Sequence, residues 1–119
     1  MDGRARLEAA LRAGRAIDGK TPLARLIALD VDFHTAIYRL AGNPAIEEMI
    51  APQWLHMRRS MATVLAELDY RESAWTEHEA IAAQILAGNI AGAESSAQAH
   101  ALTAGRRTEE RLRAIEQAA

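Results

Sequence analysis

The sequence predicts an all-α protein, and three observations support this prediction. Half of its 119 residues are hydrophobic but only 4% are aromatic, a composition that favours closely packed helices over a β-sandwich. Apolar residues recur at spacings of three and four, the period of an amphipathic helix. Glycine, asparagine and proline stand where such helices would end and restart. We therefore expect an antiparallel helical bundle, formed by a single domain over residues 1–119.

The first two helices are predicted from their boundaries. Residues 3–16 form the first helix, which the polar linker 18–20 closes. The second begins with Thr21 as its N-cap and Pro22 at its first helical position, the two residue types that favour these positions. It ends at Gly42, because glycine commonly terminates a helix.

Three further helices follow. The third is expected from Asn43 to about residue 68, with a kink at Pro52, because proline removes a helical hydrogen bond. The fourth covers about residues 72–87 and stops at Gly88. The fifth starts at about Ile90 and continues into a tail of mixed charge. Since so short a turn joins the last two helices, we expect them to form an antiparallel hairpin.

The charge and the cysteine content exclude several classes of protein. Fourteen basic and sixteen acidic residues give a formal charge of −2, so the chain lacks the basic excess that nucleic acid selects. It contains no cysteine, which leaves His, Asp and Glu as metal ligands. We find no signal-peptide core and no apolar run of about 18 residues. These features predict a cytoplasmic protein that contacts neither DNA nor a membrane directly.

Two polar residues interrupt the apolar face of the second predicted helix. The apolar positions on this face are Leu23, Leu26, Ile27, Phe33, Ile37 and Leu40. The same series passes through Asp30 and His34, which therefore lie on the inward face one turn apart. Asp32 points away from this face, because it lies about 200° round the helix from Asp30 at ~100° per residue.

A histidine also interrupts the apolar face of each of the last two helices. The two series are Trp75, His78, Ile81, Ala82, Ile85 and Ile90, Ala93, Ala97, His100, Ala101, Ala104. His78 precedes Gly88 by ten residues and His100 follows Ile90 by ten. Both therefore lie about 15 Å along the hairpin from its turn, at a rise of ~1.5 Å per residue. We expect the two side chains to face each other.

A shared divalent metal ion explains these inward polar residues. Burying four polar groups without partners would cost on the order of 1 to 3 kcal/mol each. Imidazole suits Zn, Ni, Cu or Fe, and a carboxylate adds tolerance for Mn. We therefore predict that Asp30, His34, His78 and His100 bind the ion, either as a closed structural site or with coordination positions left open. The alternative is an Asp30–His34 hydrogen bond and two unrelated core histidines.

Two segments carry a resemblance to a known family. DVDFHTAIYRLAGNP and the later EHEAIAAQILAGNIAGAESSAQAH resemble the FCD domain, the ligand-binding half of FadR-type GntR transcriptional regulators. The shared pattern has four parts: an Asp four residues before the His of a Phe-His pair, a Gly-Asn-Pro sequence, a Glu-His pair, and a His 22 residues after that pair. The resemblance spans about Leu7 to Arg113. It places the family's metal ligands on Asp30, His34, His78 and His100.

The resemblance implies a function as well as a fold. It predicts a helical domain that holds Zn, Ni or Mn, binds a small organic acid at the ion, and signals to an attached winged helix-turn-helix. We find no winged helix in these residues, since one would need roughly another 70, and we expect DNA contact through a separate domain. We also expect a homodimer.

A carboxylate effector needs a partner besides the ion. The guanidinium fork matches two carboxylate oxygens, so Arg58 and Arg59, with His56 on the same predicted helix, are candidate effector-binding residues. We expect a sensor and not an enzyme, because the inward faces carry no further Asp or Glu to serve as a general base. A small helical hydrolase using the same ligands, and a metal-free interaction module, are the alternatives.

Overall fold

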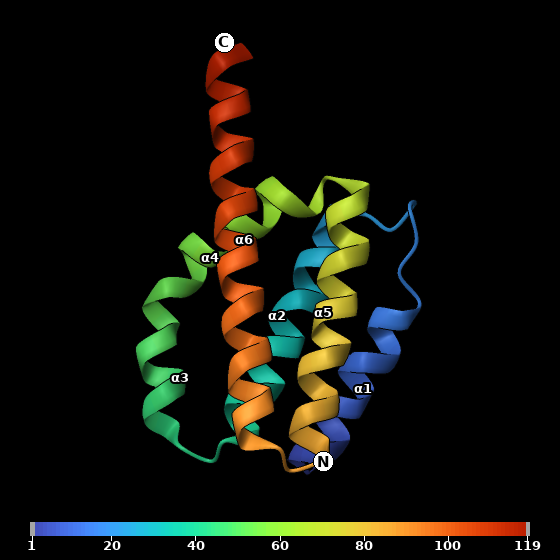
Figure 1. The fold of residues 1–119 in the computed structure, drawn as a ribbon, viewed down its shortest axis with the longest axis vertical. Coiled ribbons are helices and arrows are strands. Elements are labelled where there is room, and N and C mark those ends of the chain that lie inside the picture. Colours follow the sequence, from blue (N-terminus) through green and yellow to red (C-terminus); the bar gives the residue numbers. More distant parts are fainter. Residues whose placement is uncertain (1, 119) are drawn as a thin grey trace. The chain divides into compact units, whose positions relative to one another are not determined.

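The computed structural model describes residues 2–118, and these residues are almost entirely helical. They contain six α-helices, one 3-10 helix and no strand (Figure 1). The elements are α1 (Gly3–Arg15), α2 (Leu23–Leu40), α3 (Pro44–Ile50), η1 (Ala51–Gln53), α4 (Trp54–Leu65), α5 (Leu68–Leu86) and α6 (Ile90–Ala118). The all-α prediction is confirmed. None of these helices has the length and apolar character that a bilayer-spanning segment requires.

The chain divides into two compact units, one up to Ala62 and one from Thr63. The division falls within α4. Neighbouring helices pack against each other within each unit, α1 against α2 in the first and α5 against α6 in the second. These two helix pairs carry all four predicted metal ligands.

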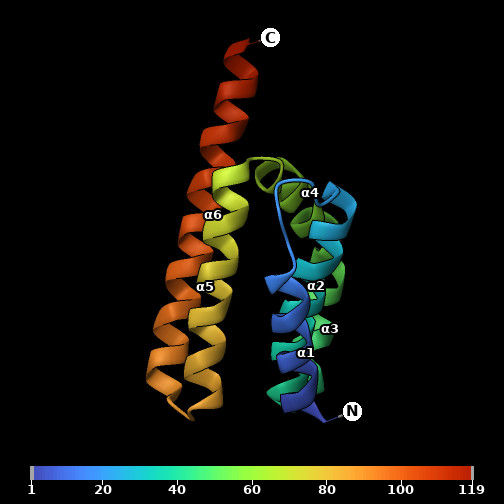
Figure 2. The same cartoon turned by 90° about the vertical axis from the view of Figure 1, so that its right-hand side faces the viewer.

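In the first unit, α1 and α2 run antiparallel (Figure 2). A Cβ atom placed on Gly3 would lie 2.5 Å from Cδ1 of Leu40, so the start of α1 lies beside the end of α2. Leu7 and Leu11, one turn apart on α1, are buried. The side chain of Asp2 accepts a hydrogen bond from the backbone N–H of Ala5 at 2.8 Å, which caps α1.

The predicted start of α2 is wrong by one residue. Pro22, not Thr21, is the N-cap, and it makes no side-chain cap bond. The Thr21 hydroxyl is engaged in the preceding linker, where it accepts a hydrogen bond from the N–H of Asp18 at 3.0 Å. A threonine that bonds backward in this way closes a turn and does not cap the helix that follows.

The predicted kink at Pro52 is confirmed as a break between two helices. α3 starts after Asn43, whose side chain accepts a hydrogen bond from the N–H of Ala45 at 3.1 Å, with Pro44 at its first position. It ends at Ile50, and the 3-10 helix η1, which contains Pro52, separates it from α4. The break follows from the missing N–H of proline.

In the second unit, α5 and α6 form the predicted antiparallel hairpin (Figures 1 and 2). Gly88 has a φ of +74°, and its N–H donates to Ile85 O at 3.0 Å while the Asn89 N–H donates to Gln84 O at 2.9 Å. This is a Schellman ending of α5. The Asn89 side chain then accepts from the N–H of Gly92 at 2.9 Å, so one turn ends α5 and caps α6.

The far end of the hairpin is also fixed. α5 begins at Leu68, four residues before the predicted start, because Tyr70 is buried in its first turn. Arg107 of α6 lies 5.3 Å from the centre of the Tyr70 ring and 3.0 Å from Oδ2 of Asp69. The hydrogen bond from Arg107 lowers the pKa of Asp69 below its ordinary value. These contacts tie α6 to the start of α5.

The face that α6 presents to α5 differs from the predicted one. Ile90 is 82% exposed, and Ala97 and Ala101 are exposed as well. His100 is the buried residue of this helix among those described. The apolar residues of α6 are mostly alanines, and their positions indicate the buried face of a helix only weakly. The predicted apolar face is therefore rotated relative to the buried face in the structure.

The turn glycine can be tested against a glycine within a helix. Gly88→Ala should lower the free energy of unfolding by about 1 to 2 kcal/mol, because a Cβ at positive φ is strained although no atom lies within 4 Å of it. Gly105→Ala, in the middle of α6 and equally free of neighbours, should raise that free energy by up to about 1 kcal/mol. Urea denaturation of both variants measures the difference. Equal effects of the two substitutions would contradict the assigned turn.

Candidate metal centre

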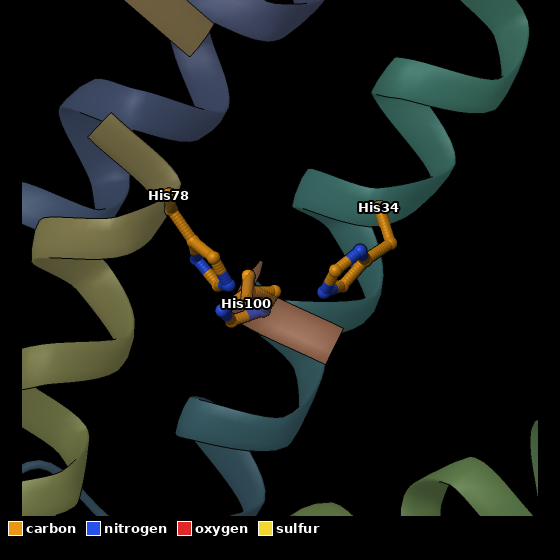
Figure 3. Close-up of side chains that lie close together, drawn as sticks. All are labelled: His34, His78 and His100. Carbon is orange, nitrogen blue, oxygen red and sulfur yellow. The ribbon is translucent and has the colours of Figure 1, made fainter. Parts of the chain in front are cut away.

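The α5–α6 hairpin brings two histidines together, as predicted from their equal separation from the turn. The ring centroids of His78 and His100 lie 4.8 Å apart, with their planes at 72° (Figure 3). His78 has an exposed fraction of 0% and His100 of 7%. Trp75, one turn before His78, places its ring edge-on to that imidazole at 5.0 Å. Both rings are therefore shielded from solvent.

The geometry of this pair fits two ligands of one metal ion. Zn–N bonds of about 2.1 Å, a ring radius of about 1.1 Å and a ligand angle of about 90 to 109° place two ring centroids about 4.5 to 5.2 Å apart. The observed 4.8 Å lies within this range. Imidazole nitrogens are donors that Zn and Ni prefer, so the residues present fit such an ion.

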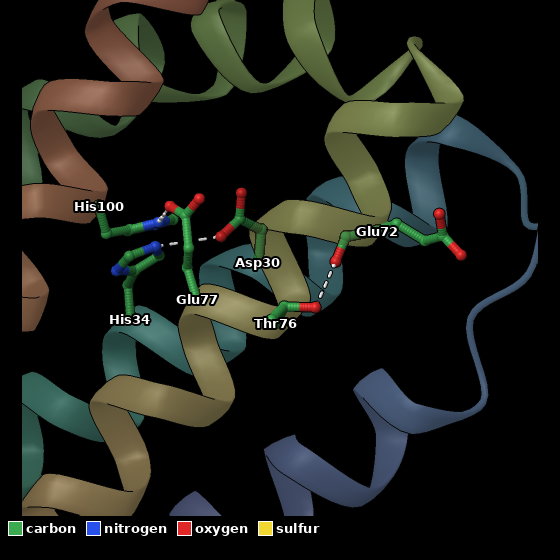
Figure 4. A network of polar contacts seen from close by, with 6 residues as sticks. All are labelled: Asp30, His34, Glu72, Thr76, Glu77 and His100. Carbon is green, nitrogen blue, oxygen red and sulfur yellow. Dashed lines mark hydrogen bonds and ion pairs between the residues drawn. The ribbon is translucent and has the colours of Figure 1, made fainter.

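A carboxylate contacts one of the two rings. Oε1 of Glu77 lies 2.7 Å from Nδ1 of His100 (Figure 4). Because an ionised carboxylate only accepts hydrogen bonds, Nδ1 is the protonated ring nitrogen and donates to Glu77. The remaining nitrogen, Nε2, then carries the lone pair of the neutral ring.

The first unit carries the other two predicted ligands. Oδ1 of Asp30 lies 3.0 Å from Nε2 of His34, one turn along α2 (Figure 4). This separation corresponds to an ion pair when the His34 ring is protonated. It also fits two neighbouring ligands of one ion, since two bonds of about 2.1 Å at about 90° place their donor atoms about 3.0 Å apart. Asp32 is exposed, as predicted, so this carboxylate does not belong to the pair.

Aromatic side chains line the same stretch of α2. Phe33 lies edge-on to His34 at 5.4 Å, and Tyr38 lies 6.5 Å from it. Trp54 of α4 lies 6.3 Å from the Tyr38 ring. Burial, and secondarily the charge of Asp30, raise the pKa of Tyr38 above its ordinary value, so its hydroxyl keeps its proton at neutral pH and remains a hydrogen-bond donor.

The three predicted effector-binding residues lie on α4. His56, Arg58 and Arg59 are all exposed. Their role at a ligand stays a prediction.

The sequence pattern did not indicate the contacts of two residues of α5. The carboxylate of Glu77, which precedes His78 in the sequence, contacts His100 of the neighbouring helix. Glu77 lies seven residues, about two helical turns, before Gln84, whose side chain bonds that of Asn89 at the base of α6. Glu77 therefore lies on the same edge of α5 as Gln84, the edge that faces α6. Arg71, buried on α5, was not singled out. Its Nε and Nη2 donate to Leu65 O at 3.2 and 3.1 Å, which satisfies a carbonyl at the end of α4.

Comparison with known proteins identifies the family. No curated protein and no solved structure matches the chain. The family model of the FCD domain matches residues 2–104, which include α1, α2, α5, the first part of α6 and all four predicted ligands. FCD domains are the regulatory, effector-binding domains of GntR-family regulators. With a match over most of its length, the chain belongs to the FCD domain family.

Proposed function

We propose that this chain is the effector-sensing domain of a FadR-type GntR transcriptional regulator, and that it senses a small carboxylate through a bound divalent metal ion. The observation that carries the proposal is the buried pair of imidazoles whose centroids lie 4.8 Å apart. Family membership supplies the regulatory role. The donor chemistry of the pair supplies the reason to expect a metal.

In the proposed site the two units contribute to one ion. His78 and His100 come from the α5–α6 hairpin, and His34 and Asp30 come from α2. Support comes from the residue types, since His34, His78 and His100 together qualify as a candidate metal-binding group. Three imidazoles and a carboxylate suit Zn, Ni or Mn. When bound, such an ion supplies open coordination positions for the oxygens of a carboxylate effector.

The protein groups would then select the effector. Arg58 and Arg59 offer guanidinium forks for a carboxylate, and His56 lies on the same helix. Effector binding would bias the helices between two arrangements, which is how a ligand-binding domain signals to an attached domain. DNA contact would fall to a separate winged helix-turn-helix domain, in agreement with the formal charge of −2 on these 119 residues.

Other predictions accompany this function. A homodimer, a cytoplasmic location and the organisation of residues 1–119 as one domain stay predictions.

A metalloenzyme using the same ligands is the competing function. It requires a general base beside an open metal position, and the carboxylate of Glu77, which contacts the histidine pair, is engaged with His100. Assays for ester and phosphoester hydrolysis by the metal-loaded protein separate the two.

The metal ligands can be tested by substitution. The double variant His78→Ala/His100→Ala should lose the bound metal, from about one equivalent per chain to near zero, and should melt at a lower temperature, because metal binding contributes to folding. Metal analysis of protein purified without chelator measures the content. An unchanged metal content would refute the assignment.

A milder pair of substitutions separates ligand loss from misfolding. Asp30→Asn should weaken metal binding about 10-fold or more, since it removes a charged ligand. Asp32→Asn makes the same change at an exposed position two residues away and should leave metal binding unchanged. If both variants bind metal like the wild type, Asp30 is not a ligand.

The effector class is tested by calorimetry. Acetate, succinate and citrate titrated into the metal-loaded protein should give binding for at least one acid, and chelator-treated protein should give none, because the ion anchors the carboxylate. Substituting Arg58→Ala and Arg59→Ala together should weaken that binding by about 1 to 3 kcal/mol. Equal binding with and without metal would contradict a metal-anchored effector.

A further inference from the structure

The contact between Glu77 and His100 joins two helices within the second unit. Glu77 lies on α5 next to His78, yet its carboxylate reaches the ring on α6, at 2.7 Å from Nδ1. The side chain of Glu77 is 30% exposed and that of His100 is 9% exposed. A buried ring with one nitrogen bonded to a carboxylate has a fixed orientation and a fixed protonated nitrogen.

The length of the contact indicates its kind. Charge-assisted N–H···O bonds measure about 2.7 to 2.9 Å. Two neighbouring ligands of one ion, with bonds of about 2.1 Å at about 90°, would stand about 3.0 Å apart. The 2.7 Å between Glu77 and His100 therefore fits a hydrogen bond to the ring better than a second bond to a shared ion.

We propose that Glu77 is a positioning residue for the metal centre: it holds the Nδ1–H of His100, so that Nε2 is the nitrogen offered to the ion. This inference rests on the proposed function, because it takes His100 to be a ligand. A carboxylate behind the ring also makes the imidazole a stronger donor, and loss of such a partner typically weakens metal binding 10- to 100-fold.

Glu77 differs in this respect from Glu72 on the same helix. Glu72 is exposed, and its backbone carbonyl, not its carboxylate, accepts a hydrogen bond from Thr76 at 3.1 Å. Figure 4 shows its side chain extending away from His100. Glu72→Gln therefore makes the same change of charge on the same helix without touching the ring, and serves as the matched control.

Two variants of Glu77 separate charge from shape. Glu77→Gln keeps the size of the side chain but removes the charge and adds an N–H₂ donor. The amide can accept from Nδ1–H in one tautomer and donate to the lone pair of Nδ1 in the other. Glu77→Asp keeps the charge on a shorter side chain. If Glu77→Gln lowers the fraction of folded protein, Glu77→Asp is compared with the wild type in its place, because it retains the carboxylate.

The first measurement determines which nitrogen of the His100 ring is protonated in the metal-free protein. In the chelator-treated protein at alkaline pH, ¹⁵N-histidine NMR should find His100 protonated at Nδ1 in the wild type and in Glu72→Gln. In Glu77→Gln a substantial fraction should shift to the Nε2-protonated form. An unchanged tautomer in Glu77→Gln overturns the proposal. Because no metal is present, this result does not depend on the proposed function.

The second reading is metal binding. Titration with Co²⁺ or Zn²⁺ should give a Kd 10- to 100-fold higher for Glu77→Gln than for the wild type, an intermediate value for Glu77→Asp, and a value within about 2-fold for Glu72→Gln. The visible spectrum of the Co²⁺-saturated Glu77→Gln protein should also change, which a purely structural contact would not cause. A wild-type Kd in Glu77→Gln, or an equal loss in Glu72→Gln, overturns the positioning role. A wild-type protein that binds no metal refutes the proposed function instead.

Discussion

The register of the α5–α6 hairpin is the constraint on which the histidine pair depends. Moving α6 by one residue against α5 would shift it by about 1.5 Å and rotate its side chains by about 100°, which would turn His100 away from His78. The Schellman ending at Gly88 fixes that register at one end of the hairpin. The contacts of Arg107 with Asp69 and Tyr70 fix it at the other. Between them the rings meet at 4.8 Å.

Each half of the proposed ligand set is built by local structure. The spacing of four residues on α2 is sufficient to bring Asp30 within 3.0 Å of His34, and the hairpin is sufficient to pair His78 with His100. In the proposed site, an ion held by both halves would stabilise the conformation that it binds, and an effector that binds the ion could shift the population of that conformation.

The sequence predicted those features that single residues determine. Gly88, Asn43 and Pro52 marked real helix boundaries, since each has a backbone property that few residues share. Counting from Gly88 placed the two histidines correctly. The outcome differed where several arrangements had similar energies: Thr21 bonds into the linker and does not cap α2, and the alanines of α6 gave too weak a pattern to fix its face. The direction of the Glu77 side chain depends on its torsions and on the neighbouring helix, which no spacing along one helix determines.

The most direct measurement is an anomalous difference map from crystals of protein purified without chelator, with data collected on both sides of the absorption edge of the metal found. We expect a single strong peak at bonding distance, about 2.0 to 2.2 Å, from Nε2 of His100 and from one ring nitrogen each of His78 and His34, with an oxygen of Asp30 completing the protein ligands. A map without a peak beside these histidines, or with its peak elsewhere on the chain, would refute the proposed ligand set.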